Sequence, residues 1–103
     1  MVYNRMYAVV YGPDWEDLAY FSDLHKAKRK LIVQTNGFSE ERPPFYPFIY
    51  EYNTDDHGVY HRRKGTYLVN YKAFQDALAH FNTVQKLLED RDLVDRLVEF
   101  SMD

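Results

Sequence analysis

The chain has 103 residues, enough for one compact domain and too few for two ordinary ones, so we expect a single domain over residues 1–103. It contains no cysteine, which excludes a disulfide framework and a thiolate metal site. A formal net charge of −3 argues against a dedicated nucleic-acid binder, because such proteins usually carry a basic excess.

The first 21 residues predict a β-hairpin. Residues 5–11, with the sequence RMYAVVY, carry apolar side chains on both faces, which is typical of a strand that is covered on both sides. Gly12-Pro13-Asp14 has the composition of a turn. Residues 18–21, LAYF, then predict the return strand of the hairpin.

A helix is predicted to follow this hairpin. Ser22 and Asp23 are N-cap residues placed ahead of the sequence LHKAKRKLIVQTNG. Its inward stripe at helical spacing consists of Leu24, Ala27 and Leu31. Asn36-Gly37 predicts a left-handed stop, with Phe38 packing back on the last turn.

Residues 38–47, FSEERPPFYP, are the one linker-like stretch, and they are too short to separate two domains. Residues 45–52, FYPFIYEY, predict a strand whose first half Pro47 would push to a sheet edge or a bulge. Alternation places two residues on one face, Ile49 and Glu51. It places four aromatic residues on the other: Tyr46, Phe48, Tyr50 and Tyr52.

The middle of the chain predicts a second hairpin and a further strand. Residues 53–58, NTDDHG, have the composition of a hairpin loop, and residues 59–63, VYHRR, predict its return strand. Lys64-Gly65 predicts a turn, and residues 66–70, TYLVN, predict a short strand.

From Asn70 onward the hydrophobic spacing becomes helical and continues to Val98. About 30 unbroken helical residues would span about 45 Å, longer than such a domain, so we expect two packed helices or one that bends. The caps Asn82-Thr83 and Asp92 mark where a break would fall. The order β-β-α-β-β-β-α predicts an α+β fold, with a mainly antiparallel sheet and a long or kinked C-terminal helical segment packed against it.

Residues 55–64, DDHGVYHRRK, combine carboxylates, histidines and cations. On a strand His57 and His61 would face the same side, and Asp55 or Asp56 could complete a zinc site. The cations of residues 62–64 would repel a metal ion, and a calcium loop fails because Lys64 stands where a bidentate Glu is needed. We therefore interpret the stretch as a hairpin tip and expect no metal and no cofactor.

Two basic clusters raise the possibility of nucleic-acid or phosphate binding. One lies on the first predicted helix and the other at the predicted hairpin, and together they contain Lys26, Arg29, Lys30, Arg62, Arg63 and Lys64. Interleaved tyrosines on the sheet could stack bases, as in single-strand binders. Exposed helix faces and hairpin ends are usually charged, and acidic neighbours dilute the field, so this function is the alternative hypothesis.

Tyrosine content favours protein–protein interaction. Aromatic residues form 17% of the chain, including ten tyrosines. The plain structural explanation is a small sheet covered by tyrosines, because aromatic side chains favour strands. The functional interpretation is an interaction surface for another protein or for a second copy of the chain. The candidate partner-binding residues are Trp15, Tyr46, Tyr50, Tyr52 and Tyr60.

Catalytic motifs are missing from the sequence. It has no cysteine nucleophile, no Gly-rich phosphate loop and no metalloprotease His-Glu spacing, so we expect no enzymatic activity. The segment from Lys72 onward holds seven acidic and four basic residues, whereas the first predicted helix is basic. Complementary patches of this kind favour association of copies or partners.

The segments YAVVY, AYFSDLHKAKRKL and FYPFIYEY resemble, in style, short uncharacterised proteins encoded by large double-stranded DNA viruses. The resemblance covers the first half of the chain and carries no functional residue with it. It implies a virion component or a small accessory factor that acts by binding. The start lacks the apolar run of a signal peptide, and no segment approaches the length of a membrane span. We therefore expect an intracellular location, in the cytoplasm or nucleus, or a place in the virion.

Overall fold

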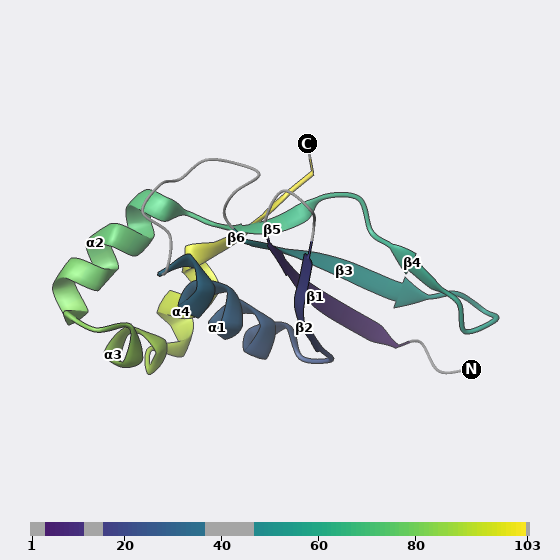
Figure 1. Cartoon of the computed structure of the whole chain (residues 1–103), viewed down its shortest axis with the longest axis horizontal. Helices are drawn as coiled ribbons and strands as arrows, with labels where there is room; N and C mark the ends of the chain where they lie inside the picture. The colour runs from purple at the N-terminus through teal and green to yellow at the C-terminus, as the bar shows by residue number, and fades with distance from the viewer. Residues whose placement is uncertain (1–3, 12–15, 37–46, 103) are drawn as a thin grey trace.

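A computed structural model of the chain describes residues 4–11, 16–36 and 47–102, with the side chains of residues 11 and 16–18 left aside. The described residues form an elongated α+β domain that measures 46 × 28 × 22 Å (Figure 1). Its elements, in chain order, are β1 (Arg5–Tyr11), β2 (Glu16–Phe21), α1 (Leu24–Thr35), β3 (Phe48–Thr54), β4 (Tyr60–Arg62), β5 (Thr66–Val69), α2 (Tyr71–Phe81), α3 (Val84–Leu88), α4 (Arg91–Leu97) and β6 (Val98–Ser101).

The six strands form one antiparallel sheet with the order β2-β1-β3-β5-β6, and β4 pairs with β3 beside this path. The α+β class and the antiparallel sheet confirm the prediction from sequence. β4 and β5 lie along the same edge of β3, because Tyr52 pairs with Arg62 and Ile49 pairs with Tyr67. The register slips by two residues between these pairs, so Lys64-Gly65 forms a bulge within one strand path. The chain does not reverse there, whereas the turn predicted at this dipeptide implied a reversal.

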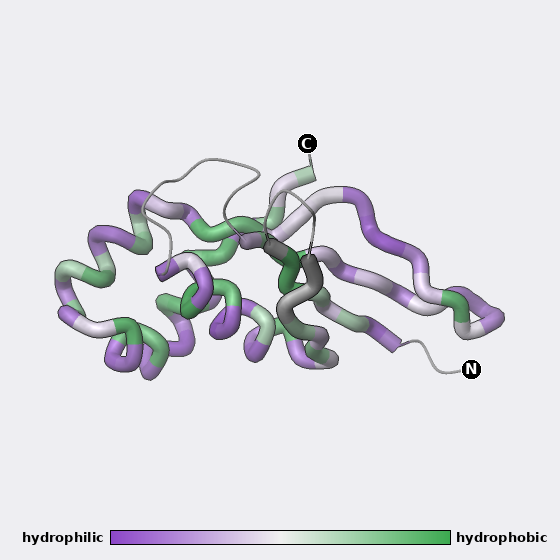
Figure 2. Tube along the Cα trace, viewed as in Figure 1, coloured by the Kyte–Doolittle hydropathy of each residue, from purple (hydrophilic) through white to green (hydrophobic). Residues whose placement is uncertain are grey.

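The helices cover one face of this sheet. Alternate residues of the central strands, such as Tyr7, Val9 and Ile49, point to that face and pack against α1. The cluster continues through buried residues of the other helices, which include Phe74, Leu87, Leu88, Val94 and Leu97. Figure 2 shows this pattern as hydrophobic colour in the centre of the sheet and hydrophilic colour along β4.

The opposite face of the sheet holds a second, smaller apolar cluster. Ala8 and Val10 of β1 and Phe48 of β3 are buried there, with Tyr50, Tyr52 and Leu68 packed against them. No helical residue belongs to this cluster among the described residues. β1 is therefore apolar on both faces because it is central and covered on both, as its sequence predicts.

The ends of α1 and the start of β3 differ in part from the sequence-based expectation. Asp23 caps α1 by accepting a hydrogen bond from the backbone N–H of His25 over 2.9 Å, which confirms the predicted start. Asn36, the C-cap of α1, has a right-handed φ of −60°. The left-handed stop predicted at Asn36-Gly37 would then fall to Gly37, which, like Phe38, lies outside the described residues. β3 begins only after Pro47, since proline offers no N–H for the ladder, and continues to Thr54.

The C-terminal segment contains three short helices and a final strand. α2 ends at Asn82, which has a left-handed φ of 68°, and Thr83 and Asp90 cap α3 and α4. The predicted break at Asn82-Thr83 is confirmed, while the second break falls at Asp90, two residues before Asp92. Val98 was expected on the helical stripe but begins β6, which pairs with β5 and closes the sheet edge.

Candidate interaction surface

The sheet face opposite the helices gathers aromatic side chains from three strands, β2, β3 and β4. Residues that lie directly opposite each other in an antiparallel pair share a face. The register therefore aligns Tyr20, Ala8 and Tyr50 in one row and Met6, Tyr52 and Arg62 in another. Tyr60 joins this face because it pairs with Thr54, two residues beyond Tyr52. We define the tyrosine face by five residues: Met6, Tyr20, Tyr50, Tyr52 and Tyr60.

Two of these tyrosines are unusually exposed for aromatic residues. Tyr20 is 53% exposed and Tyr60 is 43% exposed, whereas Tyr50 and Tyr52 are half-buried over the apolar cluster beneath them. A contiguous exposed apolar area is informative in a way that a single exposed apolar residue is not. The face thus has a buried apolar base and an aromatic surface that can contact another molecule.

One cation belongs to the same face. The guanidinium of Arg62 lies 4.3 Å from the centre of the Tyr50 ring, in a cation–π arrangement. Such a pair contributes about 0.5–1 kcal/mol where it is exposed. The tyrosine face therefore presents a positive charge next to an aromatic ring.

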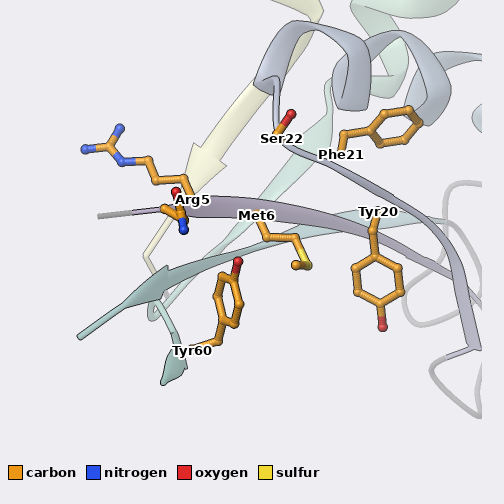
Figure 3. A pocket seen from close by; sticks show the side chains of 7 residues that line it. Arg5, Met6, Tyr20, Phe21, Ser22 and Tyr60 are labelled. Atoms are coloured by element: carbon orange, nitrogen blue, oxygen red, sulfur yellow. The ribbon is translucent and has the colours of Figure 1, made fainter. Parts of the chain in front are cut away.

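A pocket of about 260 Å³ lies at the corner of this face, at the end of β2. Figure 3 shows Met6, Tyr20 and Tyr60 pointing to one side of the sheet, while Phe21 and Ser22 lie on the other side. Asn4 and Arg5 of the β1 end complete its lining. The pocket thus wraps around the edge of β1 and extends the tyrosine face to that edge.

The structure brings together part of the predicted partner-binding set. Tyr50, Tyr52 and Tyr60 share the tyrosine face, as alternation predicts, whereas Trp15 and Tyr46 lie outside the described residues. Met6 and Tyr20 were missed as site residues. The predicted hairpin pairing of residues 5–11 with 18–21 was the signal for Tyr20, since it places Tyr20 beside the β3 aromatics once strand order is known. The signal for Met6 was strand alternation, which puts it on the same face as Ala8.

The two predicted basic clusters do not form one surface. Lys26 and Arg29 are exposed on α1 and Lys30 is half-buried there, on the helical side of the sheet. Arg29 donates a hydrogen bond to the Leu88 carbonyl over 2.8 Å, so its guanidinium fastens α1 to the end of α3. This arginine therefore has a structural partner in the fold.

The arginines of the second cluster point to opposite faces. Arg62 lies over Tyr50, while Arg63 lies 4.0 Å from the ring centre of Phe100 and its Nη1 is 3.5 Å from Oε1 of Glu51. Lys64 is exposed beside them in the bulge. Adjacent strand residues alternate between faces, so these cations cannot act as one cluster.

Asp55 organises the hairpin tip. Its Oδ1 accepts hydrogen bonds from the backbone N–H groups of His57 and Val59, and its Oδ2 lies 2.7 Å from Nε2 of His61. The hydrogen bond with His61 is the main reason that the pKa of Asp55 is lowered, and the two backbone donors add to it. This geometry confirms the hairpin tip, and the described residues contain no group of three candidate ligands that could hold a metal ion.

Comparisons with protein-family models, with curated proteins and with solved structures found no match. The fold and the surface alone define the class of molecule, an α+β domain with helices on one sheet face and tyrosines on the other. Within the described ranges, no helix combines the length and the apolar character that a membrane span requires.

Proposed function

We propose that this chain is a non-enzymatic protein–protein interaction module that binds its partner through the tyrosine face. The observation that carries this proposal is the exposure of Tyr20 and Tyr60 above a buried apolar cluster on the face away from the helices. Aromatic residues and methionine are enriched in the cores of protein interfaces, and charged residues are depleted there. Tyrosine also offers a large contact area at low entropic cost, because few side-chain torsions must be fixed.

The proposed role is that of a structural or accessory subunit in a larger assembly, with another protein or a second copy as the partner. The first helix exposes Lys26 and Arg29, while the segment from Lys72 onward is acidic. Part of this charge is paired within the domain, because Asp95 of α4 lies within ion-pair distance of His25 and Lys28 of α1. The charge that stays exposed on α1, such as that of Lys26, favours a defined orientation of neighbours. A virion would be such an assembly, which is what the resemblance to proteins of large DNA viruses implies.

Affinity recovery from the native source tests this proposal. The matched proteins are the wild-type chain, the Tyr20→Ser/Tyr60→Ser double variant and a Val33→Ser variant, since Val33 is exposed on α1, away from the tyrosine face. We expect the wild type and Val33→Ser to recover the same protein in stoichiometric amount and the double variant to lose it. A monomeric wild type in light scattering, together with recovery that is equal for all three chains, would contradict the proposal.

Nucleic-acid binding is the second candidate, and the contact of Arg62 with the Tyr50 ring favours it. A cation beside aromatic side chains on a sheet is typical of single-strand binders, in which bases stack on those side chains. The basic residues of α1 add little support to nucleic-acid binding, because α1 lies on the other side of the sheet from Arg62. Association with a mixed-sequence oligonucleotide that weakens steeply with salt and is lost in Arg62→Glu would support it over protein binding.

A further inference from the structure

The β1 strand continues past the end of β2 and leaves an open edge beside the corner pocket. The pairing of β1 with β2 ends at Tyr7 and Phe21, after which the chain turns into α1. On its other side β1 remains paired with β3 down to Arg5 and Asn53. The position beside Arg5 that a continuation of β2 would occupy is therefore left unpaired, because the chain turns into α1.

The backbone N–H and C=O groups of Arg5 point toward this unpaired position. The Asn4 carbonyl accepts from the Thr54 N–H over 3.0 Å, and the Asn4 N–H donates to Oγ1 of Thr54 over 2.8 Å, so Asn4 bonds toward β3. Successive residues of a strand direct their N–H and C=O groups to opposite sides, so those of Arg5 face away from β3. Among the described residues, the register gives Arg5 no partner on that side. An exposed strand edge of this kind can pair with another chain.

The side chain of Arg5 supplies a positive charge at the same place. Arg5 is exposed and takes part in none of the ion pairs formed within the described ranges, which join His25, Lys28, His61 and Arg63 to carboxylates. It also lines the pocket together with Met6 and two tyrosines. The edge therefore combines a backbone hydrogen-bonding site, one cation and an apolar pocket.

We propose that an extended, acidic peptide segment of a protein partner adds to the β1 edge at Arg5. A peptide residue opposite Arg5 exchanges both backbone hydrogen bonds with it and shares its face, so an acidic side chain there meets the guanidinium. The neighbouring peptide residue points to the other face, where Met6, Tyr20 and Tyr60 form the pocket wall (Figure 3). That neighbour is a large apolar residue.

The size of the pocket fits a single side chain. Sites for drug-sized ligands usually enclose about 300–1,000 Å³, and the corner pocket, at about 260 Å³, lies below that range. One buried apolar anchor beside satisfied backbone bonds is the usual form of a peptide hot spot. This inference rests on the proposed protein-binding function and names its partner chemistry: an acidic residue next to a large apolar residue in an extended segment.

The probe for this inference is the peptide acetyl-Ser-Glu-Leu-Glu-Ser-amide, added to the isotope-labelled full chain. We expect amide shift changes at Arg5, Met6 and Ser22 and saturable binding with a Kd on the order of 0.1–1 mM. Two control peptides separate the contribution of the acidic side chains from that of the backbone hydrogen bonds. One has lysines in place of both glutamates, and the other has both glutamates N-methylated. Each should bind at least tenfold more weakly.

Charge reversal in the protein completes the test. Arg5→Glu should weaken the glutamate peptide at least tenfold and favour the lysine peptide, while Lys64→Glu, the same charge change at an exposed residue of the bulge, should leave both affinities unchanged. The inference is overturned if the N-methylated peptide binds as well as the parent, if the shifts fall elsewhere, or if Lys64→Glu acts like Arg5→Glu. If the peptide fails while partner recovery still depends on Tyr20 and Tyr60, the edge inference is wrong and the proposed function stands.

Discussion

The phenol hydroxyl of Tyr67 donates a hydrogen bond to Oε1 of Glu51 over 3.1 Å, on the sheet face that the helices cover. Both residues are buried, at 9% and 5% exposure. Nδ2 of Asn53 donates to the other carboxylate oxygen over 3.0 Å, and Nη1 of Arg63 approaches Oε1 at 3.5 Å. A buried carboxylate is tolerated in this position because donors from three side chains surround it.

Removal of either member of this pair should destabilise the fold. Glu51→Leu leaves the Tyr67 hydroxyl without its acceptor, and Tyr67→Phe removes one donor from a buried carboxylate, so each should lower the free energy of unfolding by about 1.5–3 kcal/mol. Urea denaturation measures the loss. The Glu51→Leu/Tyr67→Phe double variant should lose clearly less than the sum of the two. Strict additivity would show that the two side chains do not stabilise each other.

Alkaline pH should weaken the fold through Tyr67. Burial, followed by the charge of Glu51 and the hydrogen bond with it, raises the pKa of Tyr67 from 10.0 to about 12. Above the ordinary value the unfolded chain releases this proton while the folded chain keeps it, so the contribution to stability is complete below pH 10.0 and is lost as the pH rises toward 12.

Melting temperatures between about pH 9 and about pH 12 test this dependence. The wild type should lose stability more steeply than Tyr67→Phe across this interval, so the difference between the two proteins narrows with rising pH. Equal slopes for the wild type and Tyr67→Phe would contradict the assignment.

Strand alternation allowed the tyrosine face to be predicted from sequence in part. The pattern of residues 48–54 places Phe48, Tyr50 and Tyr52 on one face, and the structure confirms it. Alternation also implies that Arg62 and Arg63 diverge, although the prediction treated them as one cluster. The contribution of Tyr20 depends on strand order, which is fixed by long-range pairing and not by local pattern.

The C-terminal strand could not be predicted from local pattern. Val98 and Leu97 continue the apolar spacing of the preceding helix, and a short apolar run fits a strand or a helix equally well. The pairing partner decides between them, because Val69 of β5 pairs with Val98 and completes the sheet. The break at Asn82-Thr83 was predictable, since the two residues are visible as a pair of caps, whereas the expectation of two helices or one that bends missed the third helix, which Asp90 caps.

Gly65 should be the least replaceable residue of the β4–β5 bulge. It has a φ of +96°, and a Cβ added there would lie 2.4 Å from the Ser101 carbonyl oxygen and 2.7 Å from Cζ of Phe100. The Gly65→Ala variant must strain its backbone and displace β6, so we expect it to lose about 2–4 kcal/mol in urea denaturation.

Gly58 supplies the matched control for this substitution. It also has a positive φ, of +79°, but a Cβ there would meet nothing within 4 Å. Gly58→Ala should therefore cost only the backbone strain, about 1–2 kcal/mol. Equal losses for the two variants would show that the close approach of β6 to Gly65 contributes nothing to stability.

Asp55 should determine the order of the hairpin tip. The turn closes through the Gly58 N–H, which donates to the Asp55 carbonyl over 3.0 Å, and the Asp55 carboxylate binds the N–H groups of His57 and Val59. Aspartate at the first turn position with glycine at the fourth is typical of a type I turn. Asp55→Ala should therefore speed the hydrogen exchange of the His57 and Val59 amides and leave the exchange of the central strands unchanged.

Two further variants and a pH series separate the carboxylate's roles. Asp55→Asn keeps a side-chain oxygen for the backbone donors and should retain most of the protection, and His57→Ala should resemble the wild type, because the hydrogen bond at this residue uses its backbone N–H. Because the pKa of Asp55 is lowered by folding, its contribution is present above the ordinary value of 3.8 and is lost as the pH falls through the lower folded value. Protection at Val59 in the wild type should then fall toward that of Asp55→Ala. Protection that stays constant through this acidic range would show that the charge of Asp55 has no part in ordering the tip.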